Sequence, residues 1–126
     1  MTRNILLKRS FMIPIFPVLV TLMLVKDPYQ TYQRMQKTWK EKPDRSFGDG
    51  ESCVALCRAR GGRIYLLFDK DMISHSCISH ELKHAADELF GFIEAEPTQE
   101  IYEYVIGYMT ERVYRLLKKN KIKLHR

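Results

Sequence analysis

The chain has 126 residues, of which 45% are hydrophobic and 29% are charged. This balance is typical of a folded globular protein and excludes a disordered chain, and the length fits one domain over residues 1–126. The formal net charge of +6 is concentrated at the C-terminal end, where no acidic residue follows Glu111.

The N-terminal part contains an apolar run from Phe11 to Val25 that follows several basic residues, as in a signal peptide or a membrane anchor. The run is short for a membrane span, is interrupted by Pro14 and Pro17, and precedes no small-residue cleavage site. Residues 18–25 therefore predict a buried central strand, entered through an extended segment that contains the two prolines. We favour no membrane partner, and a secreted or membrane-anchored protein is the alternative.

A helix and a hairpin follow this strand. Asp27-Pro28 is typical of a helix N-terminus, and apolar residues at helical spacing continue to about Lys42. Residues 43–52 are rich in turn formers and predict a loop. Residues 52–60 alternate in polarity, Gly61-Gly62 is a two-residue turn, and residues 63–68 have high strand propensity, so 52–68 predicts a β-hairpin.

Two helices complete the predicted order. The first runs from about Ser74 to Phe90, with Gly91 as the residue that ends it, and the second from about Thr98 to Lys119. Strand, helix, hairpin, helix and helix predict an α+β domain with a small mixed or antiparallel sheet and an antiparallel C-terminal helix. The basic tail at about 118–126 indicates a nucleic acid or another acidic partner, or lysines placed favourably at the negative end of a helix dipole.

The cysteines bear on the compartment. Cys53, Cys57 and Cys77 are odd in number and form no C-x-x-C pair. They argue against a disulfide framework and against a cysteine zinc site, and therefore favour buried free thiols in the reducing cytoplasm.

The first of the two helices carries the motif H-E-x-x-H as His80-Glu81-Leu82-Lys83-His84. Side chains four residues apart are neighbours on one face of a helix, so both imidazoles can bind one Zn²⁺ ion. Glu81 then lies beside the metal and can take a proton from a zinc-activated water. The motif predicts a zinc-dependent hydrolase with Glu81 as general base, and the alternative is a pair of exposed histidines without a metal.

A catalytic zinc ion usually has three protein ligands, and the third is not evident from the spacing. The longer motif with glycine and a third histidine fails, because Asp87 and Phe90 occupy those positions. The remaining candidates are acidic residues and one further histidine: His75, Asp87, Glu94, Glu96, Glu100 and Glu103. His75 is expected to point away, and the loop glutamates are expected to be solvated. Glu100 and Glu103 remain, and Gly107 is expected to let the last helix approach Ala85 and Ala86 closely.

The stretches "ISHELKHAADELFGF" and "EPTQEIYEYVIGYMTERV" resemble small zincin-like metallopeptidases encoded by tailed bacteriophages. In that family an H-E-x-x-H-A helix precedes a helix that reads approximately E-x-x-A-Y-L-x-G-Y. Glu100, Tyr104, Gly107 and Tyr108 match this second pattern, whereas Glu103 stands where a small residue is usual. The strands "PIFPVLVTLML" and "GGRIYLLF" also look like β elements of the family.

This resemblance implies a minimal zincin-like domain with a gluzincin-type site. His80, His84 and Glu100 would be the zinc ligands, with Glu103 as the alternative third ligand, and Glu81 would be the general base. The substrate would be a protein or peptide, and the compartment would be the host cytoplasm if the chain is phage-encoded. The alternative is a catalytically silent zincin-fold module that binds a host protein or nucleic acid through its basic C-terminal region.

The tyrosines of the last helix have two possible roles. Tyr104 or Tyr108 would stabilise the oxyanion of the reaction, or each would pack in the core, as aromatic residues on a helix face usually do. Zinc is the single cofactor expected, and no residues are assigned to an organic cofactor.

Overall fold

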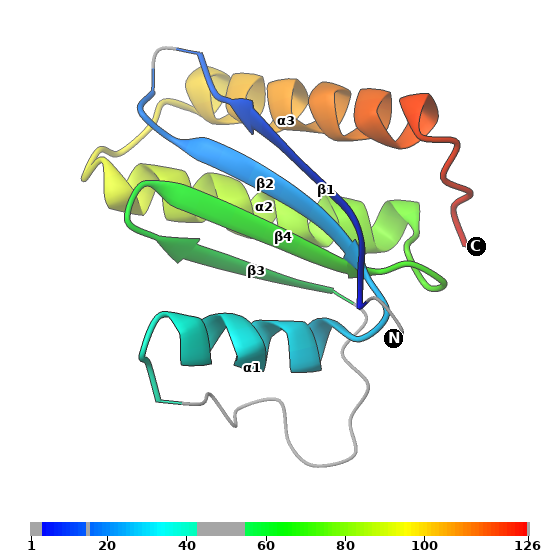
Figure 1. Ribbon diagram of the computed structural model, residues 1–126. Helices are drawn as coiled ribbons and strands as arrows, with labels where there is room; N and C mark the ends of the chain where they lie inside the picture. Colours follow the sequence, from blue (N-terminus) through cyan, green and yellow to red (C-terminus); the bar gives the residue numbers. More distant parts are fainter. Residues whose placement is uncertain (1–3, 15, 43–54, 126) are drawn as a thin grey trace.

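The computed structural model describes residues 4–14, 16–42 and 55–125. The elements are β1 (Ile5–Met12), β2 (Leu19–Val25), α1 (Pro28–Thr38), β3 (Ala55–Arg60), β4 (Arg63–Asp69), α2 (His75–Phe92) and α3 (Gln99–Lys119). The strand order is β1-β2-β4-β3, with β2 and β4 parallel and both outer pairs antiparallel. Helix α1 covers one face of this mixed sheet, and α2 and α3 cover the other (Figure 1). The predicted α+β class is confirmed.

Strand β2 is the buried central strand that the sequence predicts. Its alternate residues Val20, Leu22 and Leu24 belong to the core under α2 and α3, whereas Met23 and Val25 belong to the core under α1. Covering of both faces explains why the sequence is continuously apolar here, since neither face of the strand meets water. None of the helices in the described ranges combines the length and the apolar character that a membrane crossing requires.

Strand β1 is missing from the prediction, which reads residues 1–25 as containing one strand. Residues Ile5–Met12 pair antiparallel with β2 at the edge of the sheet. Within this strand only Leu7 and Phe11 are buried, and the register shifts between Ile5 and Leu7. The strand has no clean alternation of polar and apolar residues, because it is an edge strand with a local irregularity.

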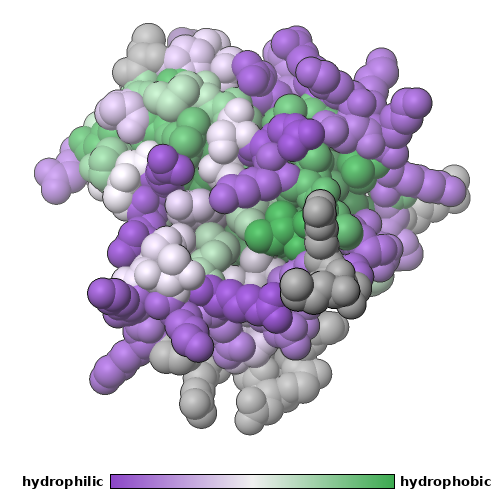
Figure 2. Space-filling model, viewed as in Figure 1, coloured by the Kyte–Doolittle hydropathy of each residue, from purple (hydrophilic) through white to green (hydrophobic). Residues whose placement is uncertain are grey.

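Helix α1 begins as predicted and ends earlier. The carboxylate of Asp27 accepts a hydrogen bond from the backbone N–H of Gln30 at 3.1 Å, which is an N-cap contact. The helix stops at Thr38 rather than near Lys42, and Lys40 has a φ of 61°, which helical backbone does not adopt. The surface over α1 is mainly hydrophilic (Figure 2).

The hairpin β3–β4 confirms the predicted turn. Gly61 and Gly62 have φ values of +55° and +78°, and two positive φ values in succession are typical of a type I′ turn. The predicted loop 43–52 and Cys53 lie outside the described residues.

Helix α2 continues past Gly91, and this corrects the predicted end. The left-handed residue that ends the helix is Glu94, with a φ of 55°. The backbone N–H groups of Glu94 and Ala95 donate to the carbonyls of Gly91 and Phe90, each at 3.2 Å, which is a Schellman motif. Gly91 thus lies inside the helix, where it is not needed for the turn.

The end of the chain folds back after α3. Ile122 and Leu124 pack against the core under α2 and α3, and the backbone N–H of His125 donates to the carbonyl of Ile73 at 2.6 Å. Lys121 and Lys123 alternate with these apolar residues and are exposed. The basic tail is therefore anchored to the domain by its apolar side chains.

The position of two glycines inside helices can be tested by replacing each with alanine and measuring whether stability rises or falls. Gly91 and Gly107 both lie in helices, and a Cβ built on either would have no heavy atom within 4 Å. We expect Gly91→Ala and Gly107→Ala each to raise the free energy of unfolding by about 0.5–1 kcal/mol, since alanine favours helix over glycine. Thermal and urea unfolding followed by circular dichroism measures this.

The control is Gly62→Ala in the hairpin turn. Gly62 has a φ of +78°, and its added Cβ would lie 3.5 Å from the Pro17 carbonyl oxygen, so this change should lower stability. A loss of stability in Gly91→Ala would instead support the glycine-ended helix that the sequence suggests.

Candidate metal centre

Helix α2 is fixed in position by its cap and by its apolar face. The hydroxyl of Ser74 accepts a hydrogen bond from the backbone N–H of Cys77 at 3.2 Å and starts the helix. The predicted apolar stripe is buried against the sheet and α3: Ile78, Leu82, Ala85, Ala86 and Leu89 are each at most 1% exposed. This face determines which side chains of α2 remain outside the core.

His80 and His84 lie one turn apart on the exposed side of α2. Their Nε2 atoms are 3.1 Å apart, and their ring centroids are 4.6 Å apart with the rings nearly perpendicular. Both side chains are exposed, so both nitrogens are accessible from solvent. When both imidazoles are neutral and carry their protons on Nδ1, both Nε2 lone pairs are free to bind one cation.

Glu81 differs from its neighbours because it is buried. The residue is 5% exposed, and its Oε2 atom accepts no hydrogen bond from any residue that the structure describes. Burial raises the pKa of the Glu81 carboxyl, while the charges of His80 and His84 oppose this shift. A carboxyl with a raised pKa exchanges protons more readily near neutral pH, as a general base and acid must.

The two imidazoles and the carboxylate converge on one point. Ligand atoms of His80, Glu81 and His84 all lie within 4.8 Å of one another. No other three His, Cys, Asp or Glu side chains converge in this way within residues 4–14, 16–42 and 55–125. Two imidazole nitrogens and an oxygen are donors that Zn²⁺ prefers, and an unpaired buried oxygen beside them fits a cation or its bound water.

A small cavity lies beside this cluster, next to the start of β3. Its volume is about 280 Å³, and its lining consists of Ala55, Ser76, Cys77, His80 and Glu81. Cys77 precedes His80 by three residues on the same helix, so the two side chains lie on one face. This spacing could have identified Cys77 from the sequence as a neighbour of the site. The cavity gives solvent-sized molecules access to Glu81.

Cys57 on β3 is the other thiol near the site. Burial raises the pKa of its thiol, and the charges of Glu81 and Glu88 raise it further. The thiol is therefore protonated at neutral pH and is neither a nucleophile nor a metal ligand in this state. Cys57 and Cys77 are both free thiols, as predicted, but each is half-buried rather than buried.

Besides their shared apolar core, α2 and α3 are joined by two contacts of tyrosines. The Tyr102 hydroxyl donates to Asp87 at 2.7 Å, and the imidazole of His75 stacks on Tyr114 at a centroid distance of 5.4 Å. His75 thus points to α3 and away from the site, as predicted. Burial and the contact with Asp87 raise the pKa of Tyr102 to about 12, so its hydroxyl stays protonated. No pattern in the sequence indicates that Tyr102 is the tyrosine that reaches α2.

These contacts fix the register of the two antiparallel helices. Asp87 contacts Tyr102, and His75 contacts Tyr114. The number of residues between His75 and Asp87 on α2 equals the number between Tyr102 and Tyr114 on α3. The point midway between His80 and His84 is therefore level with Gly107 along the helix axes, although Gly107 itself is exposed. Along the axis of α3, Glu103 is about one turn from that point and Glu100 about two turns, at 3.6 residues per turn.

Neither glutamate of α3 belongs to the converging cluster. Glu100 and Glu103 are both exposed, and Glu103 accepts a hydrogen bond from the side chain of Gln99 at 3.2 Å. Gly107 is exposed as well, with open space where a Cβ would stand. The expected close approach of Gly107 to Ala85 and Ala86 is therefore wrong, because this side of α3 faces solvent.

The remaining candidates lie apart from the histidine pair. Tyr104 is 56% exposed, and the hydroxyl of Tyr108 donates to the carbonyl of Met12 at 3.1 Å on the β1 side of α3. The ring of Tyr108 lies 6.3 Å from that of Phe11, so Tyr108 has the packing role rather than the role of oxyanion stabiliser. Glu94 and Glu96 are exposed in the connection between α2 and α3.

Comparison of the chain with protein-family models, with curated proteins and with solved structures gives no match.

Proposed function

We propose that the protein is a zinc-dependent metallopeptidase, with His80 and His84 as metal ligands and Glu81 as general base. The observation that carries this proposal is the convergence of the three side chains within 4.8 Å, with the Oε2 atom of Glu81 buried and unpaired. Burying a carboxylate without a partner costs free energy, so the position of Glu81 does not serve stability. A function beside a bound cation accounts for this position.

Each side chain has a defined part in this reaction. A zinc ion held by His80 and His84 would supply the Lewis acidity that polarisation of the scissile carbonyl and deprotonation of water require. Glu81 removes the proton from the attacking water and then delivers it to the leaving amine, for which its raised pKa is suited. The cavity at His80 and Ala55 is where the water and the scissile bond would meet.

The substrate class is supported by the position of β3. This strand is the last in the sheet order, and among the described residues it pairs with β4. Ala55 of β3 lines the cavity together with His80 and Glu81. An extended peptide that lies in this cavity along β3 would pass directly beside the general base.

A carboxylate of α3 is proposed as the third ligand, and Glu103 lies nearer than Glu100 to the level of the histidines along the helix axis. Glu100 is the residue that the resemblance to phage metallopeptidases implies. Its position in the first turn of α3 also has a purely structural reason, since an acidic side chain there interacts favourably with the helix dipole. Either residue requires α3 to move or its side chain to extend toward the histidines.

Zinc binding is the first test. Metal-free protein equilibrated with Zn²⁺ should retain about one ion per chain, measured by elemental analysis, because a catalytic site binds a single ion. His80→Ala and His84→Ala should lose this zinc and the accompanying rise in melting temperature, since a ligand that binds only the folded state stabilises it.

The matched control is His75→Ala, which removes an imidazole from the same helix. His75 contacts Tyr114 and lies outside the converging cluster, so this variant should keep its zinc. Retention of stoichiometric zinc by both His80→Ala and His84→Ala would exclude the proposed centre.

The third ligand is tested by comparing two single variants. Loss of a residue that orients a ligand without touching the metal typically costs roughly 10–100-fold in metal affinity. Glu103→Ala should weaken zinc binding by more than this, because it removes a ligand. Glu100→Ala should weaken zinc binding by less than about tenfold. Competition with a fluorescent zinc chelator measures both dissociation constants. The opposite ranking would assign the ligand to Glu100.

Catalysis is tested by Glu81→Gln. This variant should keep zinc but lose cleavage of fluorescein-labelled casein by about 100-fold or more, the usual effect of removing a general base. Glu88→Gln, on the same helix and exposed, should cleave at the wild-type rate. Equal cleavage by wild type and Glu81→Gln would refute the assigned base, and zinc binding without any cleavage by wild type would favour a silent binding module.

A further inference from the structure

The opposite face of the sheet carries a second cavity, in the groove between α1 and β1. Its volume is about 500 Å³, within the usual range for ligand sites. Two cations, Lys8 of β1 and Arg34 of α1, contribute to its lining, together with Met23, Trp39 and Tyr65. Asn4 closes the groove at one end, since its side chain bonds both the hydroxyl of Thr31 and the backbone N–H of Asp27.

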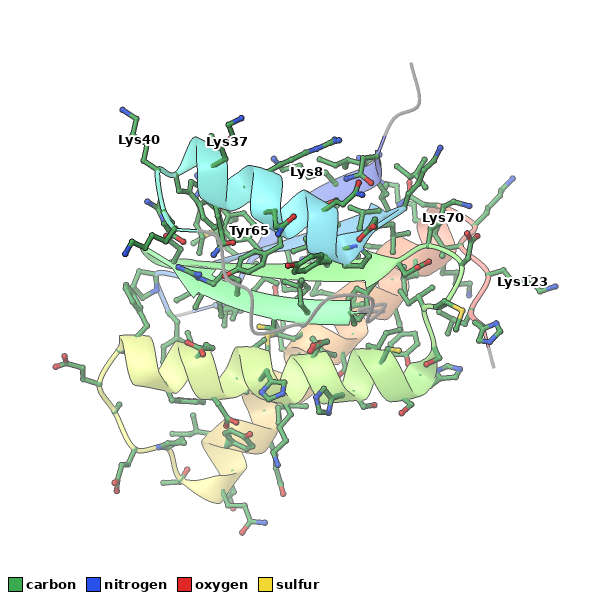
Figure 3. The ribbon with its side chains drawn as sticks, turned by 90° about the horizontal axis from the view of Figure 1, so that it is seen from below. Lys8, Lys37, Lys40, Tyr65, Lys70 and Lys123 are labelled. Carbon is green, nitrogen blue, oxygen red and sulfur yellow. The ribbon has the colours of Figure 1, made fainter. Side chains whose placement is uncertain are left out.

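Among the described residues, the charged side chains that line this groove are positive. No acidic side chain belongs to its described lining. Figure 3 shows Lys8, Lys37 and Lys40 on the α1 side of the sheet, and the sequence of α1 itself contains no Asp or Glu. Asp27, an acidic residue at the start of α1, is used as the cap of this helix.

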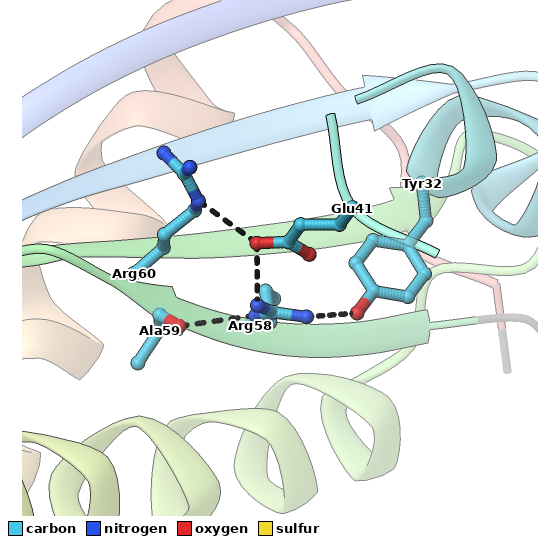
Figure 4. Close-up of polar contacts among 5 residues, drawn as sticks. All are labelled: Tyr32, Glu41, Arg58, Ala59 and Arg60. Atoms are coloured by element: carbon cyan, nitrogen blue, oxygen red, sulfur yellow. Dashed lines mark hydrogen bonds and ion pairs between the residues drawn. The ribbon is translucent and has the colours of Figure 1, made fainter. Parts of the chain in front are cut away.

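The other nearby acidic residue, Glu41, is neutralised by two arginines. Its Oε2 atom accepts from Arg58 at 3.0 Å and from Arg60 at 2.9 Å (Figure 4). The Arg58–Glu41–Arg60 cluster is therefore net positive and does not repel an anion. The groove is thus surrounded by a field that attracts anions.

The same cluster holds an aromatic pair in place. Trp39 lies 5.3 Å from Tyr65 between ring centroids, and the guanidinium groups of Arg60 and Arg58 lie 4.8 Å and 5.7 Å from the Trp39 ring. These cation–π contacts and the ion pairs restrict the motion of Trp39 before any ligand arrives. Both rings are only half-buried, so part of their surface is open to the groove.

We propose that this groove binds single-stranded nucleic acid, with phosphates at Lys8 and Arg34 and an unstacked base against Tyr65 and Trp39. Cations that follow a backbone next to aromatic rings are the combination by which proteins bind single strands. An acidic peptide would use the cations but not the rings, and a duplex would offer no free base face. The site lies on the face of the sheet opposite to α2, so it does not depend on the proposed peptidase activity.

Trp39 provides the readout, because it is the only tryptophan of the chain. The full-length protein is titrated with oligothymidine or oligouridine of about 12 nucleotides, within the site sizes known for single-strand binders. We expect saturable quenching of Trp39 fluorescence with at least one of the two. The logarithm of the affinity should fall with the logarithm of salt concentration by about 0.7 per phosphate contact.

Two sets of variants assign the binding to the groove. The double variant Lys8→Gln with Arg34→Gln should make the salt slope shallower by about 1.4, which corresponds to two lost contacts. Tyr65→Leu should weaken binding about tenfold, the size of effect that loss of one stacking ring has. Far-UV circular dichroism verifies that each variant is folded.

The matched control is Lys119→Gln with Lys123→Gln, which removes the same charge from exposed positions at the C-terminal end. This control should keep the wild-type salt slope. The proposal is overturned if neither oligonucleotide quenches Trp39, or if this control weakens binding as much as the groove variant. Equal binding of a duplex or of polyglutamate, with the same quenching, would also overturn it.

Discussion

The fold depends on the burial of β2 from both sides. Val20, Leu22 and Leu24 pack under α2 and α3, while Met23 and Val25 pack under α1. One strand therefore holds two hydrophobic cores together, and each core fixes a different part of the surface. The core under α2 positions His80, Glu81 and His84, and the core under α1 positions the basic groove. The sheet separates the two, so either surface can change without rearranging the other.

The parts of the fold that follow local rules were predictable from the sequence. The continuous apolar run of β2, the Asp27 cap and the Gly61-Gly62 turn each specify a local structure with few alternatives. Strand β1 was not predictable, because an edge strand with an irregular register has little periodicity to detect. The end of α2 was misread since glycine usually takes the left-handed position, whereas here Glu94 takes it.

The same division applies to the candidate site. His80, Glu81 and His84 converge because the spacing along one helix brings them together, and that spacing is written in the sequence. A partner from α3 depends on the angle and register between two helices, which result from packing of many side chains. The contacts of Tyr102 with Asp87 and of Tyr114 with His75 set that register, and neither was evident from the sequence.

The parallel pairing of β2 with β4 has a consequence for folding kinetics. The sheet consists of two antiparallel hairpins, and each can form from residues close in sequence, on the order of microseconds. Joining them pairs Leu19 with Arg63, and the loop that must close contains α1. Docking of the two hairpins is therefore the slow step, since long-range parallel pairing raises contact order. The helix with His80, Glu81 and His84 packs on β3 and β4, so the candidate site can assemble fully only after one half of the sheet exists.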